Sequence, residues 1–490
     1  LRTRLAHDGG FRADAGFDQG HLNLDAALPA KYGAMHAHIA AAALQQETAG
    51  FVRGFDAFRQ PAVARSNPNP EAFRDAWAVR GGLTWTPGRW TLRPFFRRSQ
   101  MAFLQHFLPG QPLEVNAQTS GGLSLEHRLD SGGPLTLTTR ALVEASEMSL
   151  REDQAEPVSF GSAFLRATRP AGRHYDFSVD GLAATLTGAL AWRAGERQTV
   201  EVGLRLDGVR YRYRTRLTAG NNDDQGNPCG FGGCLFTRPD DRSDRFFEWA
   251  PSVRWRGALS SRTSVFASLA RGVRMPQITE LYRLQSGQTV ADLSPEVIDS
   301  VELGVAHSAP RQRWQITSFA AIKRNGIFRD ADGFNVNAAR TLHAGAELDG
   351  RIELHPRATL SASVTLAAHR YRFDRLTGGE PIRRNDDVDT APRTLGNVGL
   401  TLTPIGDLEL HLEWEHMGSY WLDAANAHRY GGHDLVHANL RRSVGDWTLG
   451  VKLRNVMNRA FAERADFAFG QYRYFPGQPR SAYVWVSRRL

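Results

Sequence analysis

Two cysteines, Cys229 and Cys234, carry the only thiol chemistry that this sequence offers. They lie in the segment 227–235, and three of the residues between them are glycine, so the chain can turn tightly there. A lone pair of cysteines without nearby histidine or cysteine partners makes a poor zinc site. The spacing therefore predicts a disulfide in a small loop that faces an oxidising compartment.

Residues 416–437 form a second group with possible metal chemistry. The group holds four histidines and two aspartates, namely His416, His428, His433, His437, Asp423 and Asp434. Imidazole and carboxylate groups are common metal ligands. Histidines scattered over polar strands and loops would give the same pattern, and the sequence favours that interpretation. Residues 221–224, Asn-Asn-Asp-Asp, likewise could bind a cation but are more typical of a solvated turn.

The sequence shows no arrangement of residues suited to catalysis. It contains no Gly-X-Ser-X-Gly elbow, no His-Glu-X-X-His motif and no glycine-rich phosphate loop. We therefore expect a protein that is not an enzyme and that carries no cofactor.

The elements that must position these residues alternate between apolar and polar side chains. In residues 407–415 one face would carry Leu408, Leu410, Leu412 and Trp414, and the other Glu409, His411, Glu413 and Glu415. Residues 135–146 and 447–454 alternate in the same way. Successive side chains of a strand point to opposite faces, so each segment predicts a strand with one apolar and one polar surface.

About twenty such strands follow one another, and their connections alternate in length. Short connections fall near 86–89, 130–133, 193–196, 257–261, 308–311, 355–357, 404–407 and 443–446. Long connections fall near 47–75, 150–174, 219–244, 274–296, 373–388 and 459–480. Short turns at one end and long loops at the other are typical of an outer-membrane β-barrel. A soluble sandwich, which would also alternate, has no reason to keep this asymmetry.

Composition agrees with a single large β-architecture. Mean hydropathy is −0.40, and no apolar run reaches the roughly 18–20 residues that a transmembrane helix needs. Glycine, arginine and aromatic residues recur from end to end without a linker-like segment. We therefore expect residues 1–490 to form one all-β domain, a transmembrane antiparallel barrel.

The net charge of +9 comes almost entirely from arginine, because lysine occurs only at positions 31, 323 and 452. This charge could reflect codon bias, or it could bind lipopolysaccharide phosphates or an anionic ligand. Nucleic acid is not an expected partner, because the arginines form no single basic helix or patch. In residues 210–216 arginines interleave with Tyr211 and Tyr213. This strand predicts either a solvated arginine face above the bilayer or a basic track facing the lumen.

Four segments, in the right order, resemble the barrels of TonB-dependent receptors. They are 266–282, which ends in Val-Arg-Met-Pro-Gln-Ile-Thr-Glu-Leu-Tyr, then 300–304, 453–458 and the Pro-Gly-Gln-Pro-Arg of 476–480. The segment 47–75 also resembles a long extracellular loop of iron-complex receptors. The sequence departs from the family in Val273-Arg-Met-Pro276, which replaces the commoner Phe-Arg-Ala-Pro, and in Leu490, where an aromatic residue is usual.

Family barrels have twenty-two strands, an N-terminal plug and a short motif that binds TonB. Counted back from the C-terminus, the first strand here takes the third position, and neither the plug nor the motif is found. We therefore expect about 20 of 22 strands, with the plug and the first hairpin missing.

The resemblance implies an outer-membrane receptor in a bacterial cell. It would be a monomer that imports a ferric chelate such as a siderophore and that draws energy from the TonB–ExbB–ExbD complex through the plug. Haem is less expected, because residues 275–296 contain no histidine, and cobalamin or an oligosaccharide stays open. The alternative is a passive porin, although porins usually have only sixteen to eighteen strands.

Under this interpretation, arginine and aromatic residues of the long loops are the candidates for ligand contact. A concave apolar surface with a few directed charges suits a chelate. The candidates are Arg53, Phe55, Phe58, Arg59, Tyr282, Arg283, Trp421, His428 and Tyr430.

Overall fold

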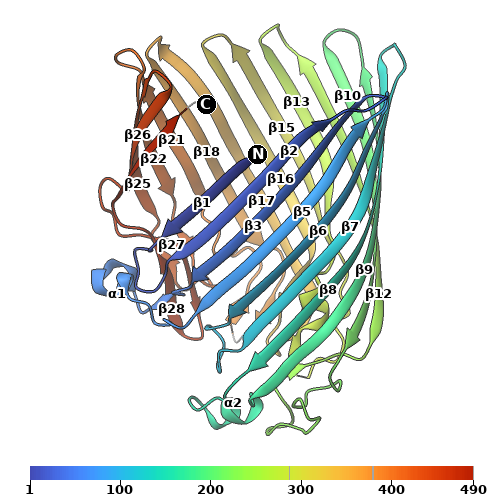
Figure 1. Ribbon diagram of the computed structural model, residues 1–490, viewed down its shortest axis with the longest axis vertical. Helices are drawn as coiled ribbons and strands as arrows, with labels where there is room; N and C mark the ends of the chain where they lie inside the picture. Colours follow the sequence, from blue (N-terminus) through green and yellow to red (C-terminus); the bar gives the residue numbers. More distant parts are fainter. Residues whose placement is uncertain (286, 378–379, 489–490) are drawn as a thin grey trace.

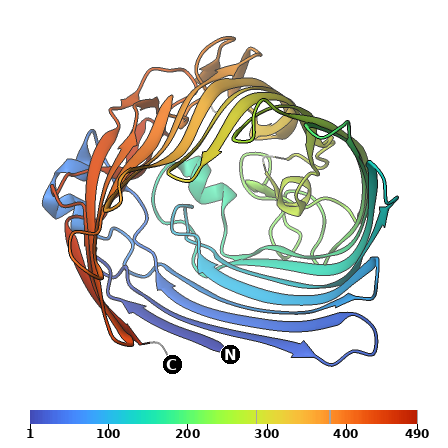
Figure 2. The same cartoon turned by 90° about the horizontal axis from the view of Figure 1, so that it is seen from above.

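A computed structural model describes residues 1–285, 287–377 and 380–488. Its main feature is one antiparallel sheet of 20 strands, in which each strand pairs with its neighbours along the chain. The sheet curls into a barrel, and both views place the two ends of the chain near each other (Figures 1 and 2). The strands are β1 (Arg2–Asp8), β2 (Phe17–Leu28), β3 (Ala34–Glu47), β5 (Phe73–Thr86), β6 (Trp90–Leu104), β7 (Leu113–Asp130), β8 (Leu135–Gln154), β9 (Gly172–Arg193), β10 (Gln198–Thr215), β12 (Arg242–Ala258), β13 (Thr263–Arg274), β15 (Glu296–Ala309), β16 (Gln312–Arg329), β17 (Asn335–His355), β18 (Ala358–Tyr371), β21 (Thr394–Leu402), β22 (Leu408–Met417), β25 (His433–Val444), β26 (Trp447–Arg454) and β29 (Ser481–Arg488).

The two ends of the barrel differ as predicted. One end, at the top of Figure 1, carries only short turns, at 29–33, 87–89, 131–134, 194–197, 259–262, 310–311, 356–357, 403–407 and 445–446. The opposite end, the loop end, carries every long connection, of which the longest are 48–72, 155–171, 216–241, 275–295, 372–393, 418–432 and 455–480. The connection 330–334 at the loop end is short, because β16 and β17 continue their pairing to that point.

The long loops contain most of the remaining structure. It comprises η1 (Ala57–Arg59), the helices α1 (Pro61–Arg65), α2 (Ala163–Thr168) and α3 (Ile278–Tyr282), and the short strands β4 (Val52–Arg53), β11 (Phe236–Thr237), β14 (Leu284–Gln285), β19 (Arg375–Thr377), β20 (Glu380–Ile382), β23 (Tyr420–Trp421), β24 (Arg429–Tyr430), β27 (Ala462–Ala468) and β28 (Gln471–Pro476). Within the described ranges, none of the helices is long and apolar enough to cross a membrane.

The outer wall of the barrel is apolar. Strand register aligns one continuous row of outward side chains, which runs Leu28, Met35, Trp85, Leu92, Leu125, Ala141, Leu186, Leu206 and Trp249. Within this row, Leu186 is 54% exposed and Trp249 is 49% exposed. Apolar residues exposed in a continuous belt indicate a surface that lipid covers.

The inner wall is polar and held by ion pairs. A row of inward side chains runs Asn23, Ala40, Arg80, Arg97, Ser120, Ser146, Gly181, Tyr211 and Asp244. Arg97 pairs with Glu144 across strands, and Arg140 pairs with Glu126. Opposite charges of neighbouring strands therefore meet on the inner wall at these positions.

The alternation in 408–414 agrees with these two walls. Leu412 and Trp414 are exposed on the outside, at 37% and 42%. On the other face, Glu409 pairs with Arg441 at 2.8 Å, and His411 hydrogen-bonds Thr401 at 3.0 Å.

The arginine-rich end of β10 presents its arginines outward. Register places Arg210 opposite Leu182, which is 52% exposed on the outer wall, and opposite Arg245 of β12. Tyr211 and Tyr213 therefore point inward, and Tyr213 is 1% exposed. Of the two interpretations of this strand, the structure supports the exposed arginine face.

An arginine placed on the outer wall should destabilise the barrel much more than an arginine placed on the inner wall. We expect Leu412→Arg to lower the free energy of unfolding by about 2–4 kcal/mol, because lipid would surround the charge. His411→Arg on the polar face should change it far less. Denaturant unfolding of both variants in lipid vesicles measures the difference, and equal losses would contradict the assignment of the two walls.

Candidate functional site

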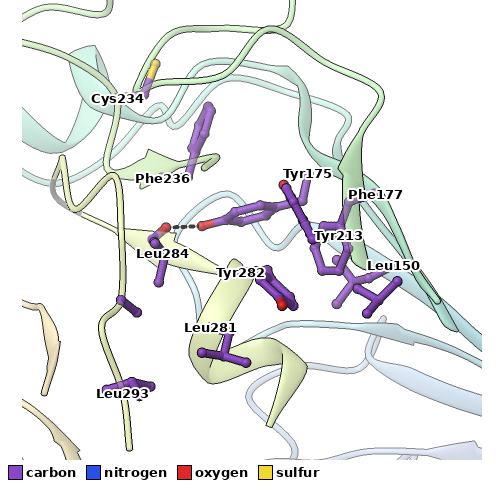
Figure 3. Close-up of a cluster of buried hydrophobic side chains, with 12 residues drawn as sticks. Leu150, Tyr175, Phe177, Tyr213, Cys234, Phe236, Leu281, Tyr282, Leu284 and Leu293 are labelled. Atoms are coloured by element: carbon purple, nitrogen blue, oxygen red, sulfur yellow. Dashed lines mark hydrogen bonds between the residues drawn. The ribbon is translucent and has the colours of Figure 1, made fainter. Parts of the chain in front are cut away.

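The loops at the loop end pack into two groups, each with its own apolar core. In the first group, the loops 216–241 and 275–295 pack on the inner faces of β9 and β10 (Figure 3). Its buried side chains are Leu150, Tyr175, Phe177, Val179, Tyr213, Cys234, Phe236, Leu281, Tyr282, Leu284, Ala291 and Leu293. The short strands β11 and β14 pair and join the two loops.

Tyr282 is the residue that fastens α3 to the wall. Its ring stacks on Tyr213 with centroids 4.5 Å apart, and its hydroxyl donates to Asp244 at 2.7 Å. Burial raises the pKa of the Tyr282 phenol, and the Asp244 carboxylate raises it further. Tyr282 is 0% exposed, so its ring belongs to the core of the loop group and is not open to solvent.

Arg283 anchors the same loop through a buried ionic network. Its guanidinium pairs with Glu152 and with Glu114, the latter at 3.2 Å, and donates to Gln105 at 2.7 Å. Glu152 also meets His174 at 3.2 Å. Burial alone would raise the pKa of the Glu152 carboxyl, but the His174 hydrogen bond and the neighbouring cations lower it to about 2. The network therefore holds a carboxylate charge inside protein, where an unpaired charge would be costly.

Loop 216–241 is held by its own buried arginine. Arg238 is 1% exposed, and its guanidinium donates to the backbone carbonyls of Thr218, His174 and Asn222 at 2.8–2.9 Å. The same loop contains Cys229 and Cys234, which are joined in a disulfide with their Cα atoms 4.9 Å apart.

The second loop group unites segments that are far apart in sequence. Loops 48–72, 418–432 and 455–480 share a core of Val52, Ala57, Phe58, Tyr420, Leu422, Tyr430, Ala462, Ala465 and Tyr474. The strand β4 pairs with β28, which sets Arg53 opposite Arg473. Phe58 lies 4.8 Å from the Tyr474 ring and 5.7 Å from the Tyr430 ring. Phe58 and Tyr430 are thus core residues of this group.

The other candidates of these loops lie around that core. Arg53, Phe55 and Arg59 are exposed, and Phe55 is 68% exposed while its ring lies 5.2 Å from that of Tyr472. The Tyr472 ring also lies 5.2 Å from the ring of His428, which stacks on Phe467. The structure therefore brings the candidates from 53–59 and 421–430 together and leaves Tyr282 and Arg283 in the first group.

Trp421 and His428 are both tied to acidic residues. The Trp421 indole N–H donates to Asp387 at 3.3 Å. His428 Nδ1 lies 2.5 Å from the carboxylate of Asp423, which is 4% exposed. These bonds fix the orientation of both rings.

Below the second group lies a cavity of about 650 Å³ that the sequence did not reveal. Its polar lining includes Glu415, His433, His437, Lys452, Arg454 and Glu463. His437 lies 3.2 Å from Glu415, and the backbone N–H of Asn455 donates to His437 Nδ1 at 3.1 Å. Burial and the nearby Glu415 raise the pKa of the Glu463 carboxyl. The predicted polar faces of 407–415 and 447–454 contain Glu415, Lys452 and Arg454 of this lining, whereas His433 and His437 come from β25 and Glu463 comes from loop 455–480.

The histidines of 416–437 do not converge on a metal. His416 pairs with Asp434 at 2.8 Å on the outer face of its strand, while His433 and His437 face the cavity. Within the described residues, no group of three or more His, Cys, Asp or Glu side chains could hold a metal ion. At 221–224, Asp223 accepts backbone N–H groups of Gln225 and Asn227, as in a closed turn.

Comparison with known proteins gives one family. The model of the family described as TonB dependent receptor-like, beta-barrel, matches residues 8–456. No curated protein matches the sequence.

Similar solved structures include three iron-related proteins. The unliganded ferric citrate transporter FecA gives a TM-score of 0.75 at 14% identity, covering 97% of this chain and 70% of that one. The siderophore receptor PiuA from Acinetobacter baumannii gives 0.73 at 12% identity, covering 96% and 74%. The ferric yersiniabactin uptake receptor FyuA from Yersinia pestis gives 0.72 at 13% identity, covering 99% and 73%. At these identities the likeness shows the fold.

Loss of the Glu152 charge should loosen loop 275–295. On β8 the outward positions become polar from Glu147 onward, so Glu152 lies beyond the apolar belt. We expect Glu152→Gln to destabilise the attached loop by about 1–3 kcal/mol, because Arg283 loses one of its two buried carboxylate partners. Hydrogen exchange of 275–295 measures this effect, and the exposed Glu147→Gln on the same strand is the control.

The pH dependence follows from the lowered pKa of Glu152. The stabilisation is fully present above the unfolded-state pKa of about 4.3 and is lost as pH falls toward 2. Exchange protection of the loop should therefore hold from about pH 7 to 5 and decline below about pH 4.5 in the natural protein. Equal pH profiles in the natural protein and Glu152→Gln would contradict this role.

The cysteine pair should resist thiol reagents until it is reduced. Protein isolated from membranes should label at Cys229 and Cys234 only after treatment with a reductant, because a disulfide carries no free thiol. Mass spectrometry of the peptide containing 227–235 gives the readout. Free labelling without reductant would show that the pair is not bonded in the cell.

Proposed function

The chain belongs to the TonB-dependent receptor family of β-barrels, and on this premise we propose that it forms the barrel of a bacterial outer-membrane receptor that imports a ferric chelate such as a siderophore. The three similar structures are named as a ferric citrate transporter, a siderophore receptor and a ferric yersiniabactin uptake receptor, and these names support this ligand class. The low identities leave the individual chelate to experiment.

The observation that carries the proposal is the second loop group. Its exposed side chains Arg53, Phe55 and Arg59 lie on a loop that contacts Tyr472, which also contacts His428. Loop 455–480 of the same group helps to line a cavity with both acidic and basic side chains. Ferric chelates are bulky and commonly present anionic oxygen atoms around the metal. Arginine offers several N–H donors to such oxygens, and aromatic rings cover apolar parts of the chelate. A site of this composition on loops is typical of a binding protein.

Energy coupling follows from the width of the barrel. A lumen of twenty or more strands would leak if it were open, and barrels of this size are plugged. The outer membrane has no ion gradient of its own, so the work of moving a plug must come from the inner membrane. We therefore infer that the full-length protein is a monomer that works with the TonB–ExbB–ExbD complex.

The outer wall suggests a lipid partner. Arg210 and Arg245 lie directly opposite each other on β10 and β12, and like charges in this position repel. Phe247, 66% exposed, lies two residues from Arg245 toward the apolar belt. Arginines at the margin of an apolar belt suit the phosphates of lipopolysaccharide in the outer leaflet.

Growth on ferric chelates as the sole iron source tests the receptor function. Deleting the gene should abolish growth on at least one chelate, and deleting TonB should have the same effect. Phe55→Ala should weaken uptake of that chelate by about tenfold, because it removes a ring worth about 1.4 kcal/mol of contact. Phe231→Ala, equally exposed at 68% but in the first loop group, is the matched control.

Two outcomes would overturn the proposal. If every chelate supports growth without the gene, the protein has another substrate. If growth persists without TonB, a passive pore is the better account.

A further inference from the structure

Two histidines face each other on the inner wall, outside both loop groups. His343 of β17 lies directly opposite His369 of β18 in the strand register. Leu348 and Leu366, which are 38% and 54% exposed on the outer wall, lie an odd number of residues away, so both histidines point into the barrel. His369 lies just before loop 372–393, which places the pair near the loop end.

The two rings are close enough to share one proton. His343 Nδ1 lies 2.7 Å from His369 Nδ1, and His343 Nε2 lies 2.8 Å from the Thr341 hydroxyl. Only one of the two Nδ1 atoms can carry the proton of that hydrogen bond. The other nitrogen therefore offers a lone pair to its neighbour, whichever tautomer is present.

We propose that His343 and His369 bind the metal of an incoming chelate through their Nδ1 atoms. They would form a second binding site, inside the barrel, in addition to the one proposed on the loops. This inference rests on the proposed function, since it needs a metal that arrives with ligands of its own. The metal would take the place of the shared proton. One ring would move its proton from Nδ1 to Nε2, so both imidazoles stay neutral and no proton is released.

The distance between the nitrogens suits such a metal. Two imidazole nitrogens each about 2.0 Å from one metal and at right angles to each other lie about 2.8 Å apart. The present separation is 2.7 Å, so small ring movements are enough. The neighbouring inward positions Ala321 and Ala367 carry small side chains.

A chelated metal fits this pair better than a bare ion. Two protein ligands are too few for a tightly bound ion, and no third His, Cys, Asp or Glu joins them in the part of the chain that the structure describes. A chelate supplies the missing ligands.

Binding of copper(II) iminodiacetate to the purified chain in detergent tests the site. This chelate leaves coordination positions open and reports nitrogen ligands through its electron paramagnetic resonance spectrum. We expect one complex per chain with a two-nitrogen signature. His343→Ala and His369→Ala should each weaken binding by about tenfold or more and remove that signature, because the second attachment is lost.

The matched control is His411→Ala. His411 also faces the lumen and bonds a threonine, Thr401, at 3.0 Å, but the residue opposite it on β25 is Asn439, not a histidine. It should bind copper as the natural protein does. His369→Gln keeps a hydrogen-bonding side chain at that position and should also lose the signature, which separates loss of a ligand from loss of folding.

The proposal fails if the natural protein shows no two-nitrogen signature, or if His411→Ala weakens binding as much as the other variants do. The measurement needs no transport. If the protein fails the growth test but binds copper at this pair, the histidine site is supported and the proposed ferric chelate is contradicted. If it passes the growth test but does not bind copper, the ferric chelate is supported and the histidine site is contradicted.

Discussion

Pairing of backbone hydrogen bonds between neighbouring strands, in a wall that faces lipid on one side, is the constraint on which the rest of the structure depends. Lipid offers no partner for an N–H or C=O group, so each spanning residue must find its partner on the next strand. The row from Leu28 to Trp249 shows the result on the outside, where the register keeps apolar side chains level across many strands. Alternation then sends polar side chains inward.

The polar inner wall must balance its own charges. Arg97 with Glu144 and Arg140 with Glu126 are ion pairs between different strands of that wall. A lumen lined in this way stays hydrated and can accept a polar ligand. The same wall carries the His343–His369 pair, where two side chains from neighbouring strands meet because the register sets them opposite each other.

The loops do not have to satisfy the hydrogen-bonding constraint that acts on the wall, yet they are packed and ordered. Each group has a core of aromatic residues, and charged groups are buried with partners: Glu152 with Arg283, and Arg238 with backbone carbonyls. Buried pairs of this kind add little net stability but make alternative positions of the loop costly. They hold loops 216–241 and 275–295 in place against the inner wall of the barrel.

The sequence by itself determined the class of the fold, the two faces of each strand and the end at which the long loops gather. These are local properties: a period of two in 408–414 assigns a face to each residue, whatever the partner strand is. The disulfide between Cys229 and Cys234 was also predictable, because it depends on their short, glycine-rich spacing. Residue type alone also made Arg53 and Phe55 candidates for ligand contact.

Only the tertiary structure decided which of these residues meet. It buried Tyr282 against Tyr213, joined the loop of Phe55 to that of His428 through Tyr472, and set Lys452 and Glu463 around one cavity. Alternation tells which way a side chain points but not which residue lies opposite it, because register depends on pairing between strands. Loop packing depends further on contacts between segments hundreds of residues apart, and no local pattern encodes those contacts.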